Sequence, residues 1–161
     1  MLELATDLYK VNLGYAQKLV ADIHDDQLCA QPVAGRVMNH AAFVLGHLAW
    51  TSDSVVRLLG VQPTGAAEWK DLVGMGAKPL SDRSRYPLKA ALLKALEDAH
   101  GRLLAAVSSA KPEVLAQPAP EQLRSRFPTL GHLLLAMMTM HEATHLGQLS
   151  AWRRAQGLPS V

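Results

Sequence analysis

The sequence has 161 residues, a length that favours one folded domain over residues 1–161 with a hydrophobic core of its own. Hydrophobic residues make up 49% of the chain and charged residues 19%, which excludes a disordered protein. The formal net charge is only +2 and no run of like charges occurs, so the basic footprint of a nucleic-acid binder is missing.

The expected location is the cytoplasm. The first residues do not combine a basic region with an apolar run, as a signal peptide would, and the longest apolar stretch, 133–140, is too short to span a bilayer. Cys29 is the single cysteine, so an internal disulfide is excluded. We expect its thiol to be a half-buried small hydrophobe, because no basic residue adjoins it.

The first two predicted helices cover 2–23 and 39–59. In the first, apolar residues step by 4, 3, 4 and 4 and so form one face that we expect to be buried: Leu4, Leu8, Val11, Tyr15 and Leu19. In the second, Asn39 provides an N-cap acceptor, and Gly60 can take the left-handed conformation that ends a helix.

The last two predicted helices cover 87–108 and 130–155. Pro87 suits a first helical position, and the apolar stripe that follows contains Leu88, Leu92, Leu96, Ala99 and Leu103. Thr129 is the expected N-cap of the last helix. The two long connections, 61–86 and 109–128, contain no strand-like alternation, and 66–73 can form a short helix. Four amphipathic helices predict an all-α four-helix bundle.

The last helix carries two histidines on its apolar stripe, whose members are Leu130, Leu134, Met137, His141, His145, Gln148 and Trp152. Because four helical residues advance about 400° and about 6 Å, the rings of His141 and His145 can meet at one point. Two imidazole nitrogens at one point can bind a metal ion at about 2.0–2.1 Å, which also removes the cost of burying them unpaired.

The second helix offers a third ligand. His47 lies inside the apolar stretch 45–50, where antiparallel packing against the last helix would bring it to the same place. His40, seven residues earlier, is ambiguous and could line the entrance of the site. The other ring nitrogens need acceptors, for which Asn12, Thr51 and Thr144 are candidates. The remaining histidines are expected on the surface or on the flank of a helix: His24, His100 and His132.

Residues 141–145 also match the zinc-protease pattern H-E-x-x-H, in which the glutamate acts as a general base. Only 16 residues follow His145, and they include no His, Asp or Glu to serve as a third ligand. A protease is therefore disfavoured. Glu142 stays a candidate general base, although it points about 100° away from His141 and a solvated or salt-bridged role is favoured.

Two motifs together resemble the DinB-like superfamily of bacterial four-helix-bundle proteins. The first is Gly46-His47-Leu48, and the second is His141-Glu-Ala-Thr-His145-Leu-Gly147-Gln148-Leu149, which lies 94 residues beyond His47. The resemblance covers nearly the whole chain. Departures are Leu146, where the family often has Arg, and Arg36-Val37-Met38, where a Trp is common.

The resemblance implies an up-down-down-up bundle in which His47, His141 and His145 hold a divalent ion, zinc or nickel. It implies either a thiol S-transferase that uses a low-molecular-weight bacterial thiol or a hydrolase of a small molecule. A non-catalytic metal-binding module for a stress response stays open, as do a homodimer and a metal-free bundle with hydrogen-bonded histidines. We expect neither a nucleic-acid nor a membrane partner.

Overall fold

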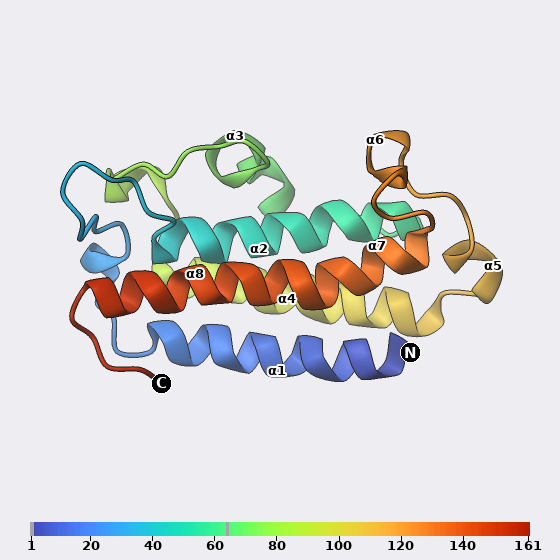
Figure 1. Ribbon diagram of the computed structural model, residues 1–161, viewed down its shortest axis with the longest axis horizontal. Helices are drawn as coiled ribbons and strands as arrows, with labels where there is room; N and C mark the ends of the chain where they lie inside the picture. The colour runs from blue at the N-terminus through green and yellow to red at the C-terminus, as the bar shows by residue number, and fades with distance from the viewer. Residues whose placement is uncertain (1, 64) are drawn as a thin grey trace.

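In the computed structural model, which describes residues 2–63 and 65–161, four long helical segments pack side by side (Figure 1). They are α1 (Leu2–Val20), α2 (Ala41–Val56), α4 (Lys89–Ser109) and a last segment composed of α7 (Leu130–Ala136), a π-helical turn (Met137–His141) and α8 (Glu142–Ala155). The connections hold α3 (Lys70–Val73), α5 (Pro112–Leu115), α6 (Glu121–Arg124) and 3-10 turns at Asp25–Gln27, Arg57–Leu59, Gly65–Trp69 and Arg83–Arg85. Within the described ranges, β pairing is limited to one isolated bridge, so the all-α prediction is confirmed.

The topology is up-down-down-up, as expected. Figure 1 shows α1 and the last segment running in one direction and α2 and α4 in the other. α2 packs against α4 and α8, and α1 packs against the same two helices, so α1 and α2 lie diagonally opposite each other. Because α2 and α4 are parallel, the chain between them must return along the bundle, which accounts for the long connection over 57–88.

α2 is the most deeply buried helix. Every residue from Ala41 to Ala49 is buried, because residues 65–88 of the long connection cover the side of α2 that faces away from the other helices. This position explains why the sequence there is apolar all round rather than on one stripe. Even so, no helix in the described part of the chain combines the length and hydropathy needed to cross a membrane.

The predicted buried face of α1 is right at Leu19, which is buried, and at Tyr15, which packs partly buried against the core, but it is wrong in the first half of the helix. Leu4, Leu8 and Val11 are 72%, 54% and 66% exposed. The buried side of the helix shares only Leu19 with the predicted face and consists of Ala5, Tyr9, Ala16, Leu19 and Val20. The two sets have the same helical spacing, and the one with smaller and more polar residues faces the core, where Tyr9 has a hydrogen-bond partner on α2.

Asn39 was predicted to be the N-cap of α2, and this prediction is wrong. His40 takes that role, and its Nδ1 accepts the backbone N–H of Phe43 at 3.2 Å. The amide of Asn39 is engaged elsewhere, since it donates to Oε1 of Gln148 on α8 at 2.8 Å. Thr129 does cap α7, and Gly60 has a φ of 76°, so both of these predictions are confirmed.

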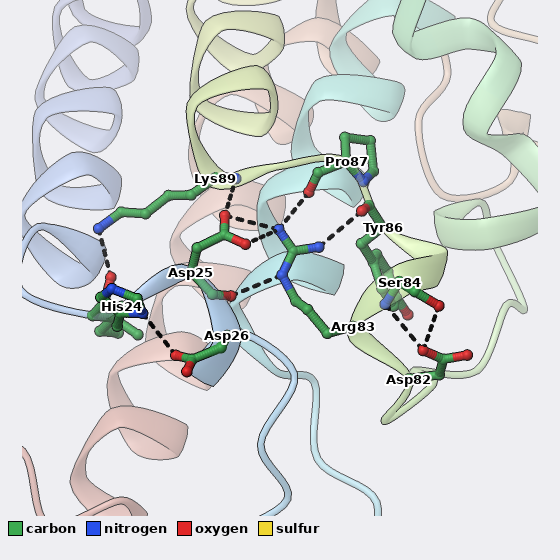
Figure 2. Close-up of polar contacts among 10 residues, drawn as sticks. His24, Asp25, Asp26, Asp82, Arg83, Ser84, Tyr86, Pro87 and Lys89 are labelled. Carbon is green, nitrogen blue, oxygen red and sulfur yellow. Dashed lines mark hydrogen bonds and ion pairs between the residues drawn. The ribbon is translucent and has the colours of Figure 1, made fainter.

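α4 begins two residues later than predicted, at Lys89, and Leu88 is 68% exposed rather than part of the core stripe. The reason is a carboxylate from another part of the chain: Asp25 Oδ1 accepts the backbone N–H of Lys89 at 2.6 Å (Figure 2). Arg83 donates to the same Oδ1 at 2.9 Å and to the carbonyl oxygens of Tyr86 and Pro87 at 2.8 Å each. This network fastens the end of the long connection to the segment after α1.

We expect the buried His40 to make stability depend on pH. Its Nε2–H donates to the carbonyl of Leu80 at 2.9 Å, and burial lowers its pKa to about 4 from an ordinary value near 6.5. Between these two pH values the unfolded chain binds a proton that the folded chain does not. The contribution of the neutral His40 to the free energy of unfolding is therefore fully present above pH ~6.5 and is lost as the pH falls towards ~4. The total loss is on the order of 3 kcal/mol.

His40→Asn keeps a capping acceptor but cannot titrate. In urea titrations of the metal-free protein at pH 7.5 and pH 5, the variant should lose less stability than the wild type. If wild type and variant lose the same free energy of unfolding between pH 7.5 and pH 5, the assignment of this pH dependence to His40 is wrong.

Candidate metal centre

His141 and His145 come from the last helical segment. His141 ends the π-helical turn, and His145 follows one turn later on α8. Their ring centroids lie 4.6 Å apart, and both side chains are half-buried. The predicted meeting of these two rings is confirmed, although the helix before them is not the regular α-helix that the spacing indicated.

His47 approaches the same place from α2. Its Nδ1 lies 2.6 Å from the carbonyl oxygen of Val73, at the end of α3. Because a carbonyl only accepts, Nδ1 must carry the proton, and the neutral ring then has its lone pair on Nε2. That Nε2 lies 3.2 Å from Nε2 of His141.

The three rings could hold a metal ion, since one nitrogen from each lies within 4.8 Å of the others. Tetrahedral ligands at about 2.0–2.1 Å from zinc lie about 3.3–3.4 Å from one another, close to the 3.2 Å that separates His47 and His141. His145 Nδ1 is buried and has no hydrogen-bond partner among the described residues, as expected of a site built for another ligand. The donor set therefore fits a divalent transition-metal ion.

The rings are also in the protonation state that a metal needs. Burial lowers the pKa of His141 to about 3 and that of His145 to about 4, and it lowers the pKa of His47 as well. The proximity of the other rings adds to the effect on His141 and His145. All three imidazoles are therefore neutral near pH 7, with a lone pair free for coordination.

Two aromatic side chains flank His47. The ring of Phe43 is parallel to it, with centroids 5.9 Å apart, and the ring of Trp50 lies 6.1 Å away. Phe43 is buried and Trp50 is half-buried, so both neighbours of the His47 ring are aromatic side chains. Access from solvent is through the half-buried rings of His141 and His145.

The predicted acceptors for the outer ring nitrogens are wrong. The acceptor found is the backbone carbonyl of Val73, which lies 26 residues from His47 in the sequence. Thr144 donates to the carbonyl of Met140 at 2.7 Å within its own helix, and Asn12 donates to the carbonyl of Met138 at 3.4 Å. Thr51 Oγ1 is buried with no partner in the described ranges. A backbone acceptor leaves no signature in the sequence, which is why it was missed.

The other histidines divide into two kinds. His24 and His132 are exposed, as predicted. His100, predicted on the surface or on the flank of a helix, is only 1% exposed and contacts Glu142 in the core, so this prediction is wrong. His40 is fully buried at the start of α2 and does not join the convergent group.

Glu142 and Cys29 both lie in the core. Glu142 is 2% exposed, and Oε1 of its carboxylate contacts Nε2 of His100 rather than the histidine cluster. A role as general base stays a prediction and would require this contact to open. Burial raises the pKa of Cys29 to about 11, so its thiol stays protonated, and the residue is fully buried rather than half-buried.

Gly46 should affect the cluster through Val73. A Cβ at position 46 would lie 3.0 Å from Cγ1 of Val73, whose carbonyl oxygen fixes the tautomer of His47. We expect Gly46→Ala to shift Val73 and to weaken metal binding about 10-fold, the lower end of the cost of losing an outer contact. Cobalt titration would measure this. Gly147→Ala is the matched control, because a Cβ there meets nothing within 4 Å; equal affinities of both variants and wild type would contradict the prediction.

Fold and cluster together define the class of this protein: an up-down-down-up four-helix bundle with three histidines from its second and last long helices gathered at one point. The family model of the DinB superfamily, compared with the sequence, matches residues 9–149, which is most of the chain. The protein therefore belongs to that superfamily. The resemblance inferred from the two histidine motifs is thereby confirmed.

Comparison with curated proteins found no match. Among solved structures, the chain is similar to YfiT from Bacillus subtilis, with a TM-score of 0.65 and 18% sequence identity over 98% of this chain and 88% of that one. YfiT is described as a probable metal-dependent hydrolase with an unusual four-helix bundle topology. At this identity, the similarity establishes the shared fold.

Proposed function

We propose that the protein binds one divalent transition-metal ion, zinc or nickel, through His47, His141 and His145 and acts on a small molecule. The observation that carries the proposal is the convergence of three neutral imidazoles, one of them held in the required tautomer by the Val73 carbonyl. Two of the rings are half-buried, so a small ligand can reach them.

The charge of the site favours an anionic ligand. In the described part of the chain, the convergent group contains only imidazoles and no carboxylate, so nothing in it offsets the two positive charges of an ion. When bound, such an ion supplies a Lewis acid that lowers the pKa of water or of a thiol. The Val73 carbonyl orients His47, and the rings of Phe43 and Trp50 flank it.

Two reactions are compatible with an anionic ligand, and thiol S-transfer from a low-molecular-weight thiol is our first choice. A neutral three-histidine set suits a thiolate, because the complex then keeps a charge of +1 and no carboxylate repels the incoming anion. Hydrolysis of a small molecule is the second choice, supported by the description of the structural relative YfiT. A protease is disfavoured, because Glu142, the glutamate of the H-E-x-x-H pattern, is hydrogen-bonded to His100 in the core rather than placed to act as a general base.

The test uses cobalt in place of the native ion. Untagged protein loaded with Co²⁺ would be titrated with 2-mercaptoethanol at neutral pH, and the near-ultraviolet spectrum followed. Growth of a thiolate-to-cobalt charge-transfer band would support S-transfer, and assays of thiol addition to small electrophiles would follow. Binding of Co²⁺ without any response to thiol would favour the hydrolase. A saturated site that exchanges no ligand at all would favour a non-catalytic module, and no uptake of Co²⁺ would refute metal binding.

A further inference from the structure

Four buried polar side chains, one from each long helix, form a connected chain through the bundle. They are Ser52 on α2, Tyr9 on α1, His100 on α4 and Glu142 on α8, and each is 6% exposed or less. Ser52 Oγ donates to the carbonyl of Leu48 at 2.9 Å. Because this uses the only proton on Ser52 Oγ, the 2.6 Å contact between Ser52 and Tyr9 must be a donation from the Tyr9 hydroxyl.

The second half of this series of contacts reaches α8. The ring of Tyr9 stacks on that of His100, with centroids 3.6 Å apart and planes 4° apart. Nε2 of His100 then contacts Oε1 of Glu142. The two ends of this series of contacts are next to metal-ligand candidates in the sequence: Leu48 follows His47, and Glu142 follows His141.

Burial of these groups is not explained by stability alone. A buried hydrogen-bonded ion pair contributes little or no more than apolar side chains of the same volume, and leaving one partner unpaired is costly. Such groups are best attested as a means of fixing one register among alternatives. Here the register in question is that of α8, because the segment before it is irregular.

The π-helical turn over Met137–His141 decides which way α8 faces. A π-helical turn accommodates one residue more than an α-helical turn, so its conversion to α-helix would rotate α8 by about 100° relative to α7. His141 and His145 would then leave the side that faces α2. Glu142 would leave the core in the same rotation, so its contact with His100 opposes the change. Asn12 on α1 adds to this by donating to the carbonyl of Met138 inside the turn.

We propose that Glu142 is a positioning residue, anchored by His100, which holds α8 in the orientation that presents His141 and His145 to His47. The inference rests on the proposed metal site and assigns Glu142 a role other than the general base of the H-E-x-x-H pattern. It predicts that truncation of the Glu142 side chain, which removes the contact with His100, damages metal binding although none of the three ligands is changed.

The test compares Co²⁺ affinity and the visible d–d spectrum of four proteins: wild type, Glu142→Ala, Glu142→Gln and Asp22→Asn. Glu142→Ala should lower the affinity about 10- to 100-fold and alter the spectrum, since the ligand geometry changes. Glu142→Gln keeps a side chain that can bond His100 and should recover most of the affinity. Asp22→Asn weakens the ion pair with the buried Arg153 further along α8, so it should lower the melting temperature but leave the cobalt site unchanged.

Wild-type affinity and spectrum in Glu142→Ala would overturn the inference, as would an equal loss of affinity in Asp22→Asn, which would point to general destabilisation. If the wild type binds no Co²⁺, the proposed function fails, and a crystal structure of metal-free Glu142→Ala decides the inference by itself. The inference then requires an altered π-helical turn or a displaced His141 ring, and an unchanged site would refute it.

Discussion

Replacing His145 by alanine should abolish stoichiometric metal binding. The wild-type protein, purified without a histidine tag, is expected to contain close to one zinc or nickel ion per chain. The variant retains only His47 and His141, and loss of a direct ligand should lower the affinity by more than about 100-fold, the upper end of the cost of an outer-contact mutation. Elemental analysis of both proteins after the same purification measures the difference.

His132→Ala is the matched control for this experiment. His132 lies on the same helical segment but is exposed and outside the convergent group. It should keep the wild-type metal content, and circular dichroism should show that both variants are folded. Equal metal content in wild type and His145→Ala would remove His145 from the site. Absence of metal in the wild type, with no uptake when metal is supplied, would leave a metal-free histidine cluster.

Trp152→Ala should cause the largest loss of stability. The side chain of Trp152 is fully buried in the main core cluster, and its Nε1–H donates to the carbonyl of Ala30 at 2.7 Å. Truncation of such a residue leaves a cavity that costs about 3–5 kcal/mol. Urea denaturation monitored by circular dichroism would give the change in the free energy of unfolding.

Trp152→Phe separates packing from the hydrogen bond. The phenyl ring keeps much of the buried area but leaves the Ala30 carbonyl without its donor, which costs about 1–3 kcal/mol. A loss in Trp152→Phe as large as that in Trp152→Ala would mean that the hydrogen bond, rather than the filled volume, holds this end of α8. Cobalt binding should survive in Trp152→Phe, since the metal cluster lies on another part of the helix.

Local sequence signals were sufficient for the helices of the last segment and for the pairing of its histidines. The predicted span 130–155 matches α7, the π-helical turn and α8 together, with Thr129 as the cap. A cap depends on one side chain and its nearest amides, and residues four apart on a helix are neighbours in any surrounding. The spacing of His141 and His145 therefore carried its information without the rest of the fold.

Tertiary contacts decided what local patterns left ambiguous. On α1, two stripes have the same periodicity, and hydrophobicity favoured Leu4, Leu8 and Val11. The stripe with Tyr9 faces the core instead, because its hydroxyl and ring have partners on α2 and α4 that are remote in the sequence. The polarity of a residue is thus a poor predictor of its burial where the interior holds a hydrogen-bond partner for it.

The same reason separates what the sequence determined at the site from what the fold added. His47, His141 and His145 were identified from periodicity and from the family motifs. The Val73 carbonyl, the π-helical turn and the contact of Glu142 with His100 depend on segments 26 to 42 residues away or on a helix irregularity. Backbone acceptors have no residue type, and a buried carboxylate looks like a surface one until its partner is known. The sequence by itself therefore determined the three candidate ligands, and only the tertiary structure decided what holds them in place.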